Sequence, residues 1–264
     1  MTMIRATLFI IVLGVLGRPV MAQDAGHPTV AQNGVFLTQG RIEFERKVNQ
    51  YAQMESTMDP GDEGWAEFSK KLMGNKFKTD YFDLLFTPGK TLYRPGRESP
   101  DKPNQFFFQP PAQQNIVYAD IDRSKAVSQK SVFEQVFLVA DSLRPITWKI
   151  TDEMKVIAGF TCRRANALIM DSIYVVAFYT DEILTSGGPE SFSGLPGMIL
   201  GVALPHEHVT WFATKVEAVP VNATAVTAPV KGKKVNNSTL KDDLQKAIKD
   251  WGKQGQLYMR QVML

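Results

Sequence analysis

The chain has 264 residues, of which 44% are hydrophobic and 10% aromatic, so it can bury a sizeable core and is not a disordered tail. Thirty basic residues face 27 acidic ones, for a formal net charge of +3, and this balance gives no reason to expect a nucleic-acid partner. The single cysteine, Cys162, excludes an internal disulfide, and with it disulfide scaffolds and cysteine-rich zinc ribbons.

The first 22 residues have the pattern of a cleavable export signal. Arg5 supplies a positive charge, Leu8–Gly17 is apolar, and Val20 and Ala22 are small residues at the third and first positions before a cut. A membrane anchor is the alternative, but so short a stretch makes only about 15 Å of helix against a ~30 Å hydrocarbon core. We therefore expect cleavage after Ala22, export to the periplasm or the outer membrane, and no transmembrane segment in the mature protein.

Residues 23–39 are polar and are expected to be flexible, and a single β-rich domain is predicted over 40–264. Between Gly40 and Val48, apolar side chains alternate with charged ones, which predicts an antiparallel strand with one solvated face. Similar segments separated by turn residues predict a meander of about ten strands in all. The further predicted strands are Phe77–Phe86, Thr91–Arg94, Ile116–Ile121, Ala126–Gln129, Val132–Val139, Ile146–Thr151, Phe160–Met170, Ile173–Thr180, Met198–Leu204 and Val209–Val219.

Two short helices are expected beside these strands. One is centred on Phe68, with Trp65 and Leu72 at helical spacing, and the other begins near the C-terminus after Ser238 or Thr239 as its cap. Gly252 and Gly255 are expected to weaken the second helix beyond its apolar face. That face is formed by Leu240, Leu244, Ile248 and Trp251. The predicted fold class is α+β and β-rich, with a strongly curved antiparallel sheet or half-open barrel.

The loop between two of the apolar strands is the most distinctive segment of the chain. Glycine permits positive φ and close backbone approach, and proline fixes turns, so the loop is expected to be a rigid, tight crossing. Its leucine is expected to plug the edge of the sheet or the end of the barrel. The residues of this structural motif are Gly187, Gly188, Pro189, Gly194, Leu195, Pro196 and Gly197.

The segment Gly194–Leu200 resembles the motif that names the GLPGLI family of exported Bacteroidetes envelope proteins, with Met198 in place of a leucine. The segments Trp148–Ala165 and Val176–Ile183 are similar to the strands that flank the motif in that family. The resemblance implies an exported protein with no assigned catalytic residues, often encoded near TonB-dependent receptors. It also implies a distant likeness to curved half-barrels that carry lipids or lipoproteins.

His206 and His208 are the one pair with the character of metal ligands. On a strand, alternate residues share a face about 6.6 Å apart, so both imidazoles could clasp one divalent metal. Zinc requires at least a third protein ligand, which a carboxylate or Cys162 would have to supply. The alternative is a polar turn after Pro205 that binds nothing. No cofactor is expected under that alternative.

Two candidate nucleophiles carry little catalytic signal. Cys162 shares a strand face with Phe160 and is expected to be a buried, inert thiol. Ser191 lacks the glycine two positions earlier that a nucleophile elbow requires. No catalytic residue is therefore predicted. Two hypotheses remain: a non-catalytic envelope module that binds or carries an apolar ligand or contacts an outer-membrane TonB-dependent receptor, and a metal-binding protein that uses His206 and His208.

Overall fold

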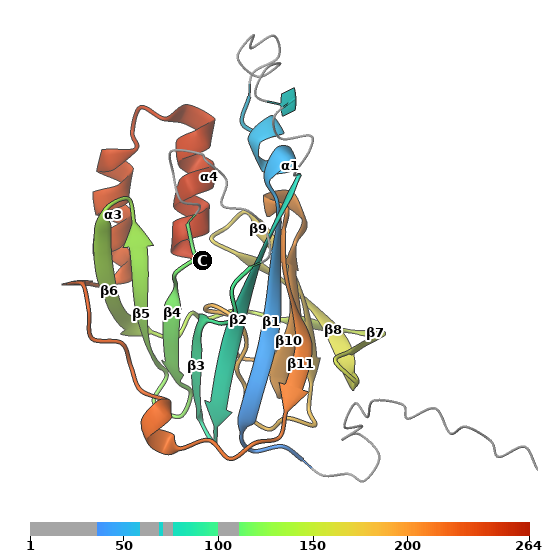
Figure 1. The fold of residues 1–264 in the computed structure, drawn as a ribbon. Helices are drawn as coiled ribbons and strands as arrows, with labels where there is room; N and C mark the ends of the chain where they lie inside the picture. The colour runs from blue at the N-terminus through green and yellow to red at the C-terminus, as the bar shows by residue number, and fades with distance from the viewer. Residues whose placement is uncertain (1–35, 59–68, 71–75, 100–110) are drawn as a thin grey trace, which may run out of the picture.

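The computed structural model describes residues 36–58, 69–70, 76–99 and 111–264. Within them the chain forms one mixed, mostly antiparallel sheet of twelve strands, which is curved but not closed into a barrel (Figure 1). The strands lie in the order β12-β6-β5-β4-β3-β2-β1-β11-β10-β9-β8-β7. Their bounds are β1 Gly40–Asn49, β2 Phe77–Thr87, β3 Lys90–Pro95, β4 Ile116–Asp120, β5 Lys125–Val132, β6 Gln135–Ser142, β7 Lys149–Ile157, β8 Phe160–Ile169, β9 Ile173–Thr180, β10 Met198–Leu204, β11 Val209–Glu217 and β12 Lys233–Val235. The predicted fold class is confirmed.

Strand β1 shows how the sequence pattern produces the sheet. Its apolar residues, Ile42 and Phe44 among them, are fully buried on one face, while the alternate charged residues are turned outward. On the outward face Arg41 forms ion pairs with Asp83 of β2 at 2.7 Å and with Glu217 of β11 at 2.8 Å. One strand is thereby tied to both of its neighbours.

Several predicted strand bounds were wrong, among them the ends of β6, at Ser142 and not Val139, and of β7, at Ile157 and not Thr151. The polar pair Lys130 and Ser131 was expected to be a turn, but both residues lie in β5, where the Lys130 side chain is buried and Nζ donates to the carbonyl oxygen of Val262 at 2.7 Å. The turn instead falls at Phe133 and Glu134. Strand β7 begins at Lys149, later than predicted, and is mostly exposed because it is an edge strand, so its sequence shows no apolar alternation.

Three α-helices accompany the sheet in the described residues: α1 Gln50–Glu55, α3 Asn237–Ala247 and α4 Gly252–Met263. Helix α1 was not predicted, since six residues are too few to show a helical period. The helix predicted around Phe68 lies outside the described residues, apart from residues 69–70, which are helical. None of the described helices is both long enough and apolar enough to cross a bilayer.

The C-terminal end forms two helices where one was predicted. The cap of α3 is Asn236, whose Oδ1 accepts from the Thr239 backbone N–H at 2.8 Å, so the expected caps Ser238 and Thr239 lie inside the helix. Gly252 adopts φ +53 where the chain reverses between α3 and α4. This glycine starts a second helix, where the sequence had suggested only a weakened end of the first.

Of the three hydrophobic clusters in the described residues, the smallest consists of Leu85, Leu92 and Val226, and the other two hold the ends of the sheet together. The larger fills the concave interior of the curved sheet, where Phe82 stacks on Tyr93 with ring centroids 4.6 Å apart and Phe192 meets Trp211 edge-on at 6.0 Å. The smaller lies between the C-terminal helices and strands β5 and β6, at the end of the sheet far from β7 (Figure 1). It consists of Val132, Phe137, Val139, Leu240, Leu244, Val262 and Met263.

Candidate ligand-binding cleft

The loop over residues 187–197, called the Gly/Pro loop below, has the expected positive φ at two of its four glycines. Gly194 and Gly197 adopt φ +90 and +133, values that residues with a side chain rarely take. At Gly187 and Gly188 neighbouring atoms instead lie close to the backbone. A Cβ atom added at Gly187 would lie 2.6 Å from Thr91 Cγ2, and one added at Gly188 would lie 2.8 Å from the Phe192 carbonyl oxygen. The loop is thus held tightly against the sheet.

Leu195 lies in the interior of the curved sheet and is 2% exposed. Phe192 from the same loop is buried beside it, and the indole N–H of Trp148 donates to the Ser193 carbonyl oxygen at 2.9 Å. These contacts give the loop a packing role. Pro189 and Pro196 flank the buried segment.

Glu190 and Lys130 form a buried polar group that the sequence did not reveal. Burial raises the pKa of Glu190, whose Oε2 accepts from Asn115 Nδ2 at 2.9 Å. Burial also lowers the pKa of Lys130 to about 8, with Glu190 acting in the opposite direction and Arg144 reinforcing the fall. Only the three-dimensional fold brings these residues together, because Lys130 comes from β5 and Glu190 from the loop.

The side chains around this group hold the segment 262–264. Lys130 Nζ donates to the Val262 carbonyl oxygen, an Arg144 guanidinium N–H to that of Met263, and Ser191 Oγ to that of Leu264. Arg144 Nε also donates to Ser191 Oγ at 3.2 Å. Ser191 is therefore engaged in structural hydrogen bonds at the end of α4.

His206 and His208 do not share the strand face on which the metal hypothesis relied. Pro205–Glu207 forms a 3₁₀ turn, and His208 caps it with φ +53, so the i, i+2 geometry of a strand was wrong here. Between the two histidines, Glu207 is buried, and its Oε1 lies 2.8 Å from Arg260 Nε of α4. Among the described residues no group of three or more His, Cys, Asp and Glu side chains could hold a metal ion.

Cys162 is fully buried in the main core and lies within hydrogen-bond distance of the Phe160 carbonyl oxygen, at 3.6 Å. Burial raises the pKa of its thiol to about 12, and the nearby Glu182 carboxylate adds to the rise. The thiol is consequently protonated at neutral pH, which makes it a poor nucleophile.

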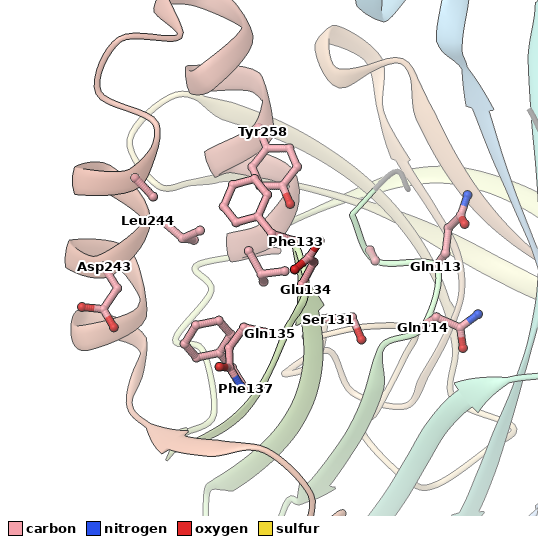
Figure 2. A pocket seen from close by; sticks show the side chains of 13 residues that line it. Gln113, Gln114, Ser131, Phe133, Glu134, Gln135, Phe137, Asp243, Leu244 and Tyr258 are labelled. Atoms are coloured by element: carbon pink, nitrogen blue, oxygen red, sulfur yellow. The ribbon is translucent and has the colours of Figure 1, made fainter. Parts of the chain in front are cut away.

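A cleft of about 750 Å³ lies between the C-terminal helices and the turn that joins β5 to β6 (Figure 2). One wall comes from α3 and α4, the other from residues 112–114 and 131–137. The lining is mixed, with apolar, aromatic, amide and acidic side chains. It comprises Ala112, Gln113, Gln114, Ser131, Val132, Phe133, Glu134, Gln135, Phe137, Asp243, Leu244, Ala247 and Tyr258.

Aromatic rings gather where the β5–β6 turn meets the C-terminal helices. Phe133 stacks on Tyr258 with centroids 5.1 Å apart and an interplanar angle of 7°. Trp251, in the turn between α3 and α4, meets both rings edge-on at 5.7 and 5.8 Å. Burial raises the pKa of Tyr258, while a backbone hydrogen bond with Phe133 opposes that rise. The cleft therefore has a wide aromatic wall that remains partly accessible, since Phe133 is 44% exposed.

The charged side chains that line the cleft are all acidic. Glu134 and Asp243 are carboxylates, and none of the described lining residues is Lys, Arg or His. Asp243 Oδ2 pairs at 3.0 Å with Nζ of Lys233, which stands at the margin of the cleft and lies 5.7 Å from the Phe137 ring centroid. The cleft is thus suited to ligands that are neutral or positively charged.

A second cleft, of about 410 Å³, is also lined by residues of α3 and α4 but contains basic as well as acidic side chains. Its lining includes three basic side chains, Arg144, Lys241 and Arg260, together with Asp141 and Asp171. The remaining lining residues are Ser142, Leu143, Pro145, Met170, Asn237, Met259 and Met263.

Residues 168–201, which span the end of β8, all of β9, the Gly/Pro loop and the start of β10, match the profile of a family described as a protein of unknown function (Porph_ging). That family is associated with Bacteroidetes. No curated protein is significantly similar to this chain.

Two solved structures of PNGF-II, in the P21 and C2 space groups, are similar to this chain at 13% sequence identity and a TM-score of 0.49. The similarity covers 78% and 77% of this chain and 32% of each of those chains. The present chain therefore spans about a third of the length of the solved proteins that it matches.

Proposed function

We propose that the protein is an exported, non-catalytic binding protein of the cell envelope, of the GLPGLI kind, and that its ligand occupies the cleft between the C-terminal helices and the β5–β6 turn. The observation that carries the proposal is the cleft itself. Its volume of about 750 Å³ falls within the ~300–1,000 Å³ typical of small-molecule sites.

The rest of the molecule favours this location for the ligand. The concave interior of the sheet is filled by large side chains, including the fully buried Trp211, Phe44 and Phe82. A carrier of the filled-barrel type has no room in such an interior. The helices instead line a site at the margin of the sheet, to which Asp243, Ala247 and Tyr258 contribute.

The N-terminal pattern supports an envelope location for this binding protein. Residues 1–22 have the charge, apolar stretch and small residues of a cleavable export signal. The resemblance to GLPGLI proteins adds a TonB-dependent outer-membrane receptor as the candidate partner for ligand delivery. A non-catalytic role agrees with the state of the two candidate nucleophiles, because Cys162 is buried with a raised pKa and Ser191 donates to Leu264.

Fluorescence titration of the folded protein with Nile red, a neutral hydrophobic dye, tests the proposal. Ala247 is exposed on α3 and lines the cleft, so Ala247→Trp should fill the site without disturbing the core. Gln245→Trp, on the same helix but outside the lining, is the matched control. We expect the dye to bind the wild type and the control but not Ala247→Trp. Absence of binding to the wild type, or equal binding to all three proteins, would contradict the proposal.

A further inference from the structure

We infer that the cleft selects an organic cation, a ligand that joins an ammonium group to an apolar body, and that the ammonium is bound by Phe133, Glu134 and Tyr258. These three residues are called the aromatic–acidic corner below. The inference rests on the proposed function, since it names the chemical class of ligand for the same cleft.

The protein already binds one ammonium group of its own, that of Lys233, with a carboxylate and an aromatic ring. Lys233 Nζ lies 3.0 Å from Asp243 Oδ2 and 5.7 Å from the ring centroid of Phe137. Both partners of this lysine, the carboxylate and the ring, line the cleft. An aromatic face and a carboxylate therefore bind a primary ammonium at one end of the site, as the negative face of a ring and an anionic oxygen together should.

The aromatic–acidic corner offers the same two groups to a cation from outside. Glu134 follows Phe133 directly and lines the cleft, and among the described residues its carboxylate has no ion-pair or hydrogen-bond partner. Figure 2 shows the Glu134 carboxylate drawn below the rings of Phe133 and Tyr258. The corner thus offers a carboxylate and two aromatic rings, the same kinds of group that contact Lys233, and none of its three residues is a lysine.

The backbone at the corner gives independent support. Phe133 adopts φ +54 at the first position of a two-residue turn between paired residues Val132 and Gln135. Turns with positive φ at this position favour glycine, and a bulky side chain in this conformation is strained. Positive φ occurs at other turns of the chain as well, but here it keeps an aromatic ring 44% exposed on the wall of a cleft, which points to a use for that ring in binding.

Electrostatics disfavours the opposite class of ligand. An anionic group in the cleft would lie among two carboxylates and the negative faces of the rings. The cation at the margin, Lys233, is already paired to Asp243. At physiological ionic strength charges interact over roughly 8 Å, so this repulsion acts across a site of this size. Basic side chains that suit an anionic amphiphile line the second cleft, where Arg144, Lys241 and Arg260 lie.

Three probes with one apolar body and different charge test the inference by isothermal titration calorimetry on the folded protein. They are 3-phenylpropyl-trimethylammonium, 3-phenylpropanol and 3-phenylpropanoate. We expect the cation to bind at least tenfold more tightly than the carboxylate. Glu134→Gln should weaken binding of the cation about three- to tenfold and leave the affinity for the alcohol unchanged, because the exchange removes charge from an exposed side chain and little else.

Two further variants separate the corner from general surface charge. Phe133→Leu keeps an apolar side chain but removes the ring face, so it should weaken binding of the cation more than binding of the alcohol. Asp152→Asn, an exposed carboxylate on the edge strand β7 at the opposite end of the sheet, is the control and should change neither. If Nile red binds but the cation binds no more tightly than the other two probes, the inference alone is overturned. The same holds if Nile red binds and none of the three probes does. Absence of Nile red binding overturns the proposed function and the inference with it.

Discussion

A Cβ atom at position 197 would overlap the backbone carbonyl oxygen of Thr180, the last residue of β9. Gly197 also adopts φ +133, so both space and backbone conformation oppose a side chain there. Gly194 shares only the second property: its φ is +90, but the nearest atom to an added Cβ, Trp148 Nε1, is 3.7 Å away. The two glycines of this motif thus differ: a side chain is opposed by space and backbone conformation at position 197, but by backbone conformation alone at position 194.

We therefore expect Gly194→Ala to lower the free energy of unfolding by the strain of positive φ alone, about 1–3 kcal/mol. Gly197→Ala should lower it by clearly more, because β9 and the loop must also move apart. Urea denaturation of both variants measures the difference. Equal losses would show that the loop can shift away from Thr180 at little cost, and wild-type stability in both would contradict a structural role for these glycines.

Cys162 should react with a thiol reagent only after the protein unfolds. Its side chain is fully buried, and burial raises the pKa of the thiol to about 12, so at pH 8 both access and the reactive thiolate are lacking. Labelling with Ellman's reagent in buffer and in 6 M guanidinium chloride compares the two states. Complete labelling of the folded protein within minutes would contradict the burial of this residue.

Continuous apolar runs were sufficient to place two of the central strands. The predicted bounds of β9, Ile173–Thr180, and of β10, Met198–Leu204, coincide with those observed, because apolar runs between turn residues have few other solutions. The pattern failed where tertiary contacts override it. Lys130 looked like a turn residue, but the carbonyl oxygen of Val262 accepts its hydrogen bond inside the protein.

The cleft could not be predicted from the sequence for two reasons. Its walls come from segments far apart in the chain, 112–114, 131–137 and 243–258, and no local pattern pairs them. The turn at Phe133 and Glu134 also lacks the Asn-Gly or Asp-Gly signature of a hairpin, so a strand was predicted through it. The motif at Gly194–Leu200 was conspicuous in the sequence, yet its side chains serve packing.

Export predicts a defined N-terminus for the mature protein. When the full chain is expressed in a bacterium with an outer membrane, we expect N-terminal sequencing of the periplasmic fraction to begin at Gln23, the residue after the predicted cut. Ala22→Tyr places a large residue before the cut and should leave unprocessed protein in the membrane fraction, whereas Gln23→Tyr, on the other side of the cut, should be processed. Retention of Met1 in wild-type protein would contradict the export signal.

Lys130 should make the stability of the protein depend on pH above neutrality. Burial lowers its pKa in the folded protein to about 8, from an ordinary value of 10.5. Between these two values the unfolded chain keeps the proton and the folded protein has released it. The free energy of unfolding contributed by Lys130 therefore rises with pH across that window, at up to about 1.4 kcal/mol per pH unit, and is constant below pH 8.

The Cys162 thiol acts in the opposite direction at higher pH. Its pKa is about 12 in the folded protein against an ordinary 9.0, so above pH 9 the unfolded chain loses the proton first and stability falls. The two effects overlap in the wild type, and a single pH profile would not separate them. A comparison with Lys130→Met at each pH does so, because the thiol contributes equally to both proteins.

We expect the stability advantage of wild type over Lys130→Met, measured by urea denaturation at half-unit steps from pH 7 to 10.5, to be flat up to about pH 8. It should then grow by roughly 1–3 kcal/mol. Lys125→Met, at the exposed start of the same strand, is the matched control. A wild-type and a Lys130→Met profile that stay parallel through pH 10 would mean that the amine keeps its proton in the folded protein. The burial of Lys130 against Val262 would then be wrong, and with it the arrangement by which β5 holds the end of α4.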